Sequence, residues 1–219
     1  LIGDNYSLLQ VMSRFGLSLG FGDKTVKEVC EMNNVDCQTF LVVVNFMAEG
    51  FSRMDGSADD ISIPALVDYL RQAHIYFLDY CLPAIRRKLI EAIDCSQDDV
   101  SFLILKFFDG YMREVRKHME YEEKTVFKYV DTLIHGNAPK NYQISTFSKH
   151  HDQVGERLTE LKNIIIKYCP AKANTNVLNA ALFDIYACEE GLESHCKVED
   201  YLFVPAILKL ERRMRENEK

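Results

Sequence analysis

The sequence has no apolar run long enough to cross a membrane. A transmembrane helix needs roughly 20 consecutive apolar residues, whereas the apolar stretches at 40–47 and 100–108 are short and flanked by polar or charged residues. Leu1 is not followed by the basic start and long apolar core of a secretory signal. We therefore expect a globular protein with no membrane partner.

A stripe of basic residues is also missing. The chain has 26 Lys and Arg residues against 33 Asp and Glu residues, which gives a formal net charge of -7. The basic residues are scattered between acids, whereas a phosphate backbone is bound by clustered positive charge. We therefore expect no nucleic-acid partner.

No close Cys-x-x-Cys pair occurs among the seven cysteines. An odd number of cysteines without such pairs is typical of a reducing compartment, and we expect a cytoplasmic location. Cys81 and Cys188 fall among apolar residues at helical spacing, where a thiol commonly serves as a small buried hydrophobic group. From the sequence, we assign no chemistry to the cysteines.

Strand patterns are scarce as well. No segment outside the helical regions alternates apolar and polar residues over four or more positions between turn signals. Apolar residues recur instead at spacings of three and four, the pattern of a helix with one buried face. The predicted fold class is all-α: an up-down four-helix bundle preceded by a small helical domain.

A polar, glycine-containing stretch divides the predicted helices into two groups. We predict a small domain at 1–48, a linker at 49–63 and the bundle at 64–219. The small domain is expected to contain three short helices: Tyr6–Phe15, Thr25–Met32 and Cys37–Met47. The bundle is expected to contain four long helices: Pro64–Ile93, Gln97–Ile134, Tyr142–Tyr168 and Asn174–Met214. Because proline lacks an N–H donor and clashes with the preceding turn, we expect bends at Pro83 and Pro205.

Each long helix carries an apolar seam that is interrupted by metal-ligand side chains. The four seams contain one histidine each, and two contain a glutamate one turn later: His74, His118 with Glu122, His151, and His195 with Glu199. An ionised carboxylate in a core costs several kcal/mol unless it is paired or metal-bound. A single His-x-x-x-Glu is commonly a surface ion pair. Two such motifs, each followed by an acid and an aromatic-aliphatic pair, indicate an internal repeat.

Six ligand-type residues on four seams are the arrangement by which a helix bundle holds two metal ions. Four imidazoles and two carboxylates without a thiolate suit iron better than magnesium or calcium, and they are too many for one tetrahedral zinc. We expect two iron ions with an oxo or hydroxo bridge and bridging glutamates, and manganese or zinc as substitutes. Each iron would keep one open position for a small diatomic ligand or peroxide, with Tyr111, Tyr121 and Phe77 as candidates for the surrounding shell. A metal-free scaffold whose polar residues satisfy one another is the competing interpretation.

These residues resemble the hemerythrin-like, or HHE cation-binding, family over about residues 64–210. The resemblance rests on His74 and on three segments: 118–127, 150–158 and 195–205. Within that family the chain is most similar to the repair-of-iron-centres proteins, which join a short helical domain to a four-histidine, two-glutamate bundle. Residues 15–30 resemble the start of that short domain, but Gly20 and Phe21 stand where the family has adjacent cysteines. His150 stands where the family has the glutamate of a Glu-His pair, and it is either a group behind the ligands or an extra ligand.

The resemblance implies a non-haem di-iron protein of the nitrosative and oxidative stress response. Such a protein would support repair of iron-sulfur centres through chemistry on nitric oxide, oxygen or peroxide, with iron-sulfur proteins as partners. The alternative is a module that binds or senses oxygen or nitric oxide without turnover. The sequence does not decide between these two functions or establish an enzyme activity.

Overall fold

The computed structural model describes residues 2–3, 5–49, 61–93, 99–137, 142–149, 154–170 and 173–217, and within these ranges the regular structure is entirely helical. The predicted all-α fold class is confirmed. No helix in the described ranges is both long and apolar enough to cross a bilayer. Most of the predicted linker at 49–63 lies outside the described residues, and the predicted domain division stays a prediction.

Contacts between Cα atoms divide the chain into two units. Unit 1 comprises Leu1–Ala73, Val126–Ser148 and His195–Lys219. Unit 2 comprises His74–Thr125 and Lys149–Ser194. The boundaries fall within continuous helical stretches, so several helices contribute residues to both units.

The first part of unit 1 contains three short helices close to their predicted positions. They are α1 (Leu8–Arg14), α2 (Val26–Met32) and α3 (Cys37–Glu49), and they are followed by α4 (Ile63–Ile75). Thr25 starts α2 with a capping box, in which its side chain accepts from the Glu28 N–H and the Glu28 side chain accepts from the Thr25 N–H. The Phe15 ring lies 5.3 Å from that of Phe40 and 4.9 Å from that of Tyr69. These aromatic contacts pack α1 against α3 and α4.

A buried carboxylate connects three later segments of unit 1. They are α7 (Phe127–Ile134), the 3-10 helix η5 (Ile144–Lys149) and α10 (Val204–Asn217). Glu211 of α10 accepts from the Tyr129 hydroxyl at 2.6 Å and from the Ile144 N–H at 3.0 Å. Burial and this hydrogen bond raise the pKa of Tyr129 above its ordinary value.

The segment around Ile144 corrects one prediction. We expected one helix over Tyr142–Tyr168, whereas the structure has the short η5 helix and, beyond residues it does not describe, α8 (Val154–Tyr168). Ser145 and Thr146 belong to the residue types whose hydroxyls can compete for backbone hydrogen bonds, which disfavours a regular α-helix. Ile144 is the first residue of η5, so its N–H has no acceptor within the helix and donates to Glu211 instead.

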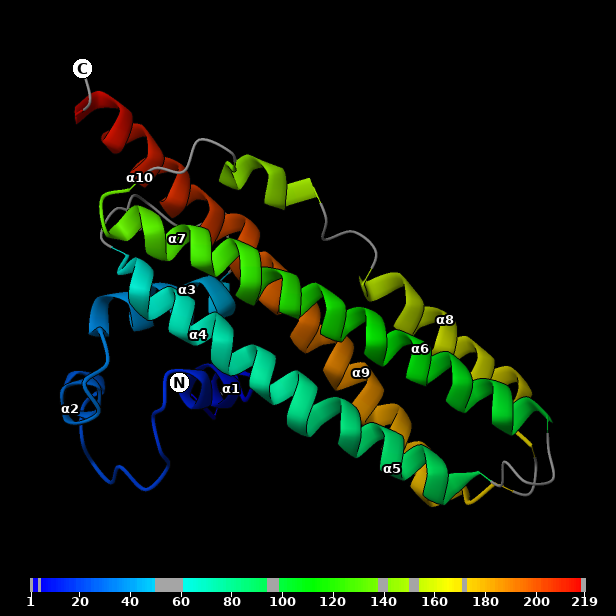
Figure 1. Cartoon of the computed structure of the whole chain (residues 1–219). Helices are drawn as coiled ribbons and strands as arrows, with labels where there is room; N and C mark the ends of the chain where they lie inside the picture. Colours follow the sequence, from blue (N-terminus) through cyan, green and yellow to red (C-terminus); the bar gives the residue numbers. More distant parts are fainter. Residues whose placement is uncertain are drawn as a thin grey trace. The chain divides into compact units, whose positions relative to one another are not determined.

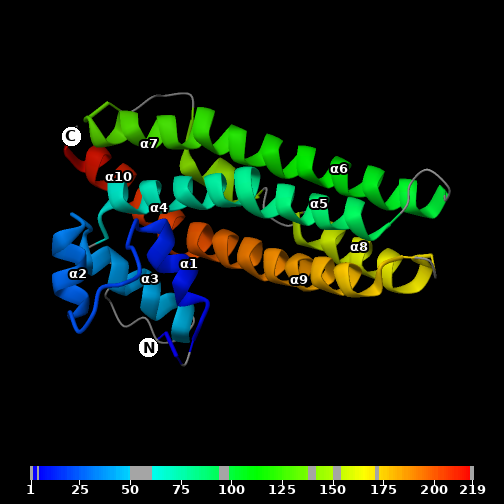
Figure 2. The ribbon, with the colours of Figure 1, turned by 90° about the horizontal axis from the view of Figure 1, so that it is seen from below.

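Unit 2 is a four-helix bundle whose neighbouring helices are joined by ion pairs. Its helices are α5 (Leu82–Ala92), α6 (Asp99–Tyr121), α8 and α9 (Thr175–Val198), which run side by side in both views (Figures 1 and 2). The pairs are Arg86–Asp109 between α5 and α6, Glu114–Arg157 between α6 and α8, Lys162–Glu189 between α8 and α9, and Lys88–Asp184 between α5 and α9. The four pairs close a ring, so the helix order around the bundle is α5, α6, α8, α9.

In the part of the chain that the structure describes, three π-helical turns interrupt the long helices without ending them. They are η3 (Tyr76–Cys81) between α4 and α5, η4 (Glu122–Val126) between α6 and α7, and η6 (Glu199–Phe203) between α9 and α10. Pro83 and Pro205 each follow such a turn within two residues, where the wider turn relieves the clash of the ring with the preceding carbonyl. Neither proline breaks its helix.

Candidate metal centre

The π-helical turns lie next to the predicted ligands. Glu122 is the first residue of η4, and Glu199 is the first residue of η6. His74 is the second-last residue of α4, which ends at Ile75. A π-helical turn places one extra residue in the turn, and such turns recur at functional sites. Here two of the turns begin at a glutamate whose side chain is buried in the core.

The two carboxylate oxygens of Glu122 contact two different histidines. Its Oε2 lies 2.8 Å from Nε2 of His74, and its Oε1 lies 2.8 Å from Nε2 of His118. The Glu122 side chain is fully buried, and that of His118 is 14% exposed. Glu122 is thus a buried carboxylate that contacts imidazoles from two different helices.

His195 and Glu199 repeat the same spacing on the last long helix. Nε2 of His195 lies 3.3 Å from Oε1 of Glu199, and both side chains are buried. The two motifs therefore present an imidazole and a carboxylate from adjacent helical turns, as the internal repeat predicted. Their burial differs from that of a surface i,i+4 pair, which would be solvated.

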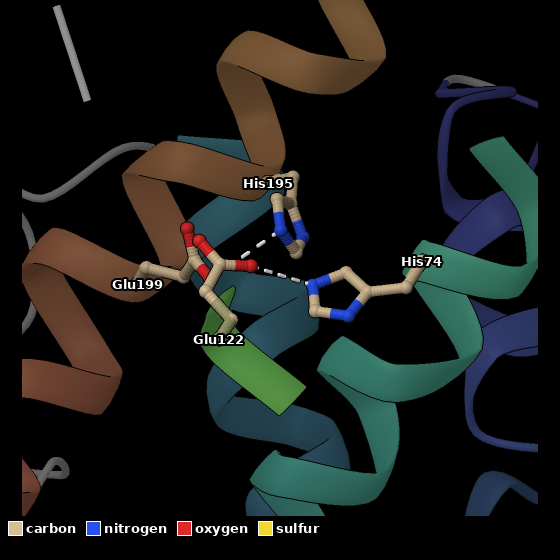
Figure 3. A group of neighbouring side chains, drawn as sticks. All are labelled: His74, Glu122, His195 and Glu199. Atoms are coloured by element: carbon tan, nitrogen blue, oxygen red, sulfur yellow. Dashed lines mark ion pairs between the residues drawn. The ribbon is translucent and has the colours of Figure 1, made fainter. Parts of the chain in front are cut away.

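Four of the six predicted ligands form one compact group, made of His74, Glu122, His195 and Glu199. One ligand atom from each residue lies within 4.8 Å of those from the other three (Figure 3). Two imidazole nitrogens and two carboxylate oxygens, all buried, are a donor set that suits a transition metal. Buried carboxylates need compensating positive charge, which a divalent cation supplies. The residues therefore fit the predicted metal centre.

Glu123 holds the far side of the His74 ring. Its Oε1 lies 3.0 Å from Nδ1 of His74, while Glu122 contacts Nε2. Burial by itself would lower the pKa of His74, but hydrogen bonds to Glu122 and then Glu123 outweigh it and raise the pKa above its ordinary value. Because Glu123 occupies Nδ1, the Nε2 atom, which faces the other buried ligand-type side chains, is the nitrogen placed to bind a metal.

The remaining predicted residues divide into three cases. His118 is outside the four-residue group but contacts Glu122 directly, on the oxygen opposite to His74. His151 and His150 lie outside the described residues, so their ligand roles stay predictions. Tyr111 and Phe77 are buried, and Tyr121 is partly exposed. The sequence analysis missed the contact of Glu123 with His74; the signal was the second acid in the Glu122-Glu123 pair.

Comparison with known proteins agrees with this donor set. A comparison with curated proteins finds no significant match to the chain. The family model described as the hemerythrin HHE cation-binding domain matches residues 65–207, which is more than half of the chain and includes all six predicted ligands. The chain therefore belongs to the hemerythrin HHE cation-binding family.

Proposed function

We propose that the chain is a non-haem di-iron protein of the nitrosative and oxidative stress response. In this role it would support repair of iron-sulfur centres through chemistry on nitric oxide, oxygen or peroxide. The observation that carries the proposal is the geometry of Glu122, whose two oxygens face His74 and His118 separately at 2.8 Å. One metal ion needs only one of these contacts, whereas a pair of ions uses both.

The proposed ligand set is the predicted one: His74, His118, Glu122, His151, His195 and Glu199. Iron bound there would supply redox chemistry and open positions for a small ligand. Glu122 and Glu199 would supply carboxylate oxygens to the metal, and Glu123 orients the His74 ring through its contact with Nδ1. The near-complete burial of His74, Glu122, His195 and Glu199 favours ligands as small as a diatomic gas or peroxide. Manganese or zinc would compete for the same oxygens and nitrogens.

The assignment to iron-sulfur repair rests on resemblance at the level of the subfamily. A cytoplasmic location and iron-sulfur proteins as partners belong to the same proposal. Gly20 and Phe21 replace the adjacent cysteines of that subfamily, so we propose no thiol chemistry for this position. Repair would then depend on the metal centre alone.

Consumption assays on reduced, iron-loaded protein test the proposed chemistry. Nitric oxide or peroxide is added in excess, and its loss is followed together with the iron spectrum. Many equivalents consumed per chain would support turnover. A single stoichiometric adduct without further consumption would instead identify the chain as a binding or sensing module.

A further inference from the structure

We propose that Cys81 and Cys188 form a redox-active dithiol, which peroxide converts into a disulfide that links η3 to α9. Cys81 is the last residue of η3, and Cys188 lies in the middle of α9. Both thiols are reduced and buried. The sequence predicted two separate packing residues, whereas in the structure the two residues are neighbours that line the same cavity.

Two contacts fix the alignment of the helices that carry these thiols. The Asn174 N–H donates to the Ala92 carbonyl at 2.8 Å, and Nζ of Lys88 lies 2.6 Å from Oδ2 of Asp184. Residue numbers rise on α9 as they fall on α5, so the two helices are antiparallel. Moving toward lower numbers from Lys88 and toward higher numbers from Asp184, the same alignment places Cys81 next to Cys188. Both residues belong to unit 2, whose ion pairs hold this arrangement.

The pair lines a cavity rather than a sealed core. A cavity of about 530 Å³ is bordered by both thiols, by the Tyr76 and Tyr80 rings and by Lys88. This space is large enough to admit a molecule as small as hydrogen peroxide. Cys81 is 8% exposed and Cys188 is 2% exposed, so Cys81 is the thiol that an oxidant reaches more readily.

The chemistry that fits this pair is a two-electron oxidation. The Cys81 thiolate attacks one peroxide oxygen and the O–O bond breaks, which yields a sulfenic acid and hydroxide; the hydroxide takes up the proton that Cys81 lost. The Cys188 thiol then attacks the sulfenic sulfur, forms the S–S bond and releases water. In sum, two thiols and one hydrogen peroxide become one disulfide and two water molecules. The neighbouring Cys81, and burial, raise the pKa of Cys188, which makes Cys188 a poor nucleophile toward peroxide and leaves the first attack to Cys81.

A metal site at this pair is less favoured by the surrounding residues. Within the described ranges, the group of three or more metal-ligand side chains is the His and Glu cluster of the metal centre. Two thiols without a third ligand are too few for a tetrahedral zinc site. Disulfide formation needs the two sulfurs alone.

The disulfide would lie close to two predicted ligands along the same helices. Cys81 follows His74 by seven residues, and Cys188 precedes His195 by seven residues. Seven residues are two helical turns, or about 10 Å. The cross-link would therefore tie together the helices that present these two histidines. The proposal stands without the metal and does not rest on the proposed function.

Peptide mapping after peroxide treatment tests this inference. The full chain, as purified and again after chelation, is treated with a few equivalents of hydrogen peroxide, alkylated and digested with trypsin without reduction. Cys81 lies on the peptide 72–86, and Cys188 shares the peptide 173–197 with Cys196. We expect these two peptides to be linked, with a combined mass about 2 Da below their sum. Reduction should separate them.

Three variants assign the link to the proposed thiols. Cys81→Ala and Cys188→Ala should lose the linked product, whereas Cys196→Ala, which alters the same tryptic peptide as Cys188, should keep it. Circular dichroism checks the fold, and serine variants replace alanine where needed. The inference is overturned if Cys81 and Cys188 stay reduced while Cys196 is oxidised, if Cys188→Ala retains the link, or if the pair yields a metal adduct instead of a disulfide.

Discussion

Glu123 and His74 form a hydrogen-bonded pair on the side of the imidazole ring that faces away from Glu122. The Oε1 atom of Glu123 lies 3.0 Å from Nδ1 of His74, and Nε2 of the same ring is 2.8 Å from Glu122. The ring is thus held between two carboxylates, of which one is a predicted ligand and the other is partly exposed. This pair holds the orientation of the ring of a predicted ligand.

Removing the Glu123 carboxylate is expected to weaken metal binding. Glu123→Ala should lower metal affinity by roughly 10- to 100-fold, the usual effect of removing a residue that orients a ligand. Glu123→Gln keeps an oxygen that can accept from Nδ1 and should recover part of the loss. Competition with a chelator measures both affinities. Equal affinities for the alanine variant and the wild type would show that Glu123 does not position His74.

Loss of Glu122 is expected to affect two metal ions together. Because its oxygens face His74 and His118 separately, Glu122→Ala should lose more than one equivalent of bound metal. Glu120→Ala is the matched control, since Glu120 lies only two residues before Glu122 but pairs with Lys124 outside the core. Metal content after dialysis gives the readout. A Glu122→Ala protein with one full equivalent at unchanged affinity would indicate terminal ligation.

Removal of the metal should destabilise the protein. A metal ion that binds only the folded state adds stability by mass action. Its removal also leaves the buried glutamates without the positive charge of the ion. We expect the chelated protein to melt several degrees lower than the metal-loaded protein. Thermal melts of both forms in the same buffer provide the comparison. Identical midpoints would argue against a metal site at these residues.

The pair of Tyr129 and Glu211 predicts a pH effect away from the metal centre. The pKa of Tyr129 is raised by burial and by the hydrogen bond to Glu211, whereas an unfolded tyrosine ionises near pH 10. The unfolded state therefore loses its proton first. The stability from this pair is fully present below about pH 10 and is lost as the pH rises toward the folded pKa.

A Tyr129→Phe variant isolates this effect. It should cost about 1–3 kcal/mol at neutral pH because the buried Glu211 loses a donor, and the difference from wild type should shrink above about pH 10. Tyr6→Phe is the control, since Tyr6 is 78% exposed. Denaturant unfolding at several pH values measures the free energies. A difference that stays constant above pH 10 would contradict the assignment.

The periodic features of the sequence predicted the helices and singled out the four His and Glu side chains that cluster in the structure. Spacings of three and four located the long helices, and the repeated His-x-x-x-Glu motif led to Glu122 and Glu199, both of which are buried. These predictions succeed because a helix with an apolar face has a fixed period that can be read directly. The identity of the chain as a family member follows from the same residues.

Other features depend on contacts that no local pattern encodes. The π-helical turn at Glu122 has no proline to mark it, unlike the turns before Pro83 and Pro205. The start of η5 at Ile144 is held by a hydrogen bond to Glu211, which is 67 residues away. The contact of Cys81 with Cys188 likewise joins residues from different helices. Such pairings become visible only when the helices are placed side by side.

Metal content is the measurement that tests the central claim most directly. The chain is purified anaerobically under reducing conditions, reconstituted with ferrous iron, freed of excess metal and analysed for its elements. The proposed di-iron centre predicts close to two irons per chain, since six ligands exceed what one ion can use. One zinc per chain with no uptake of iron would contradict it.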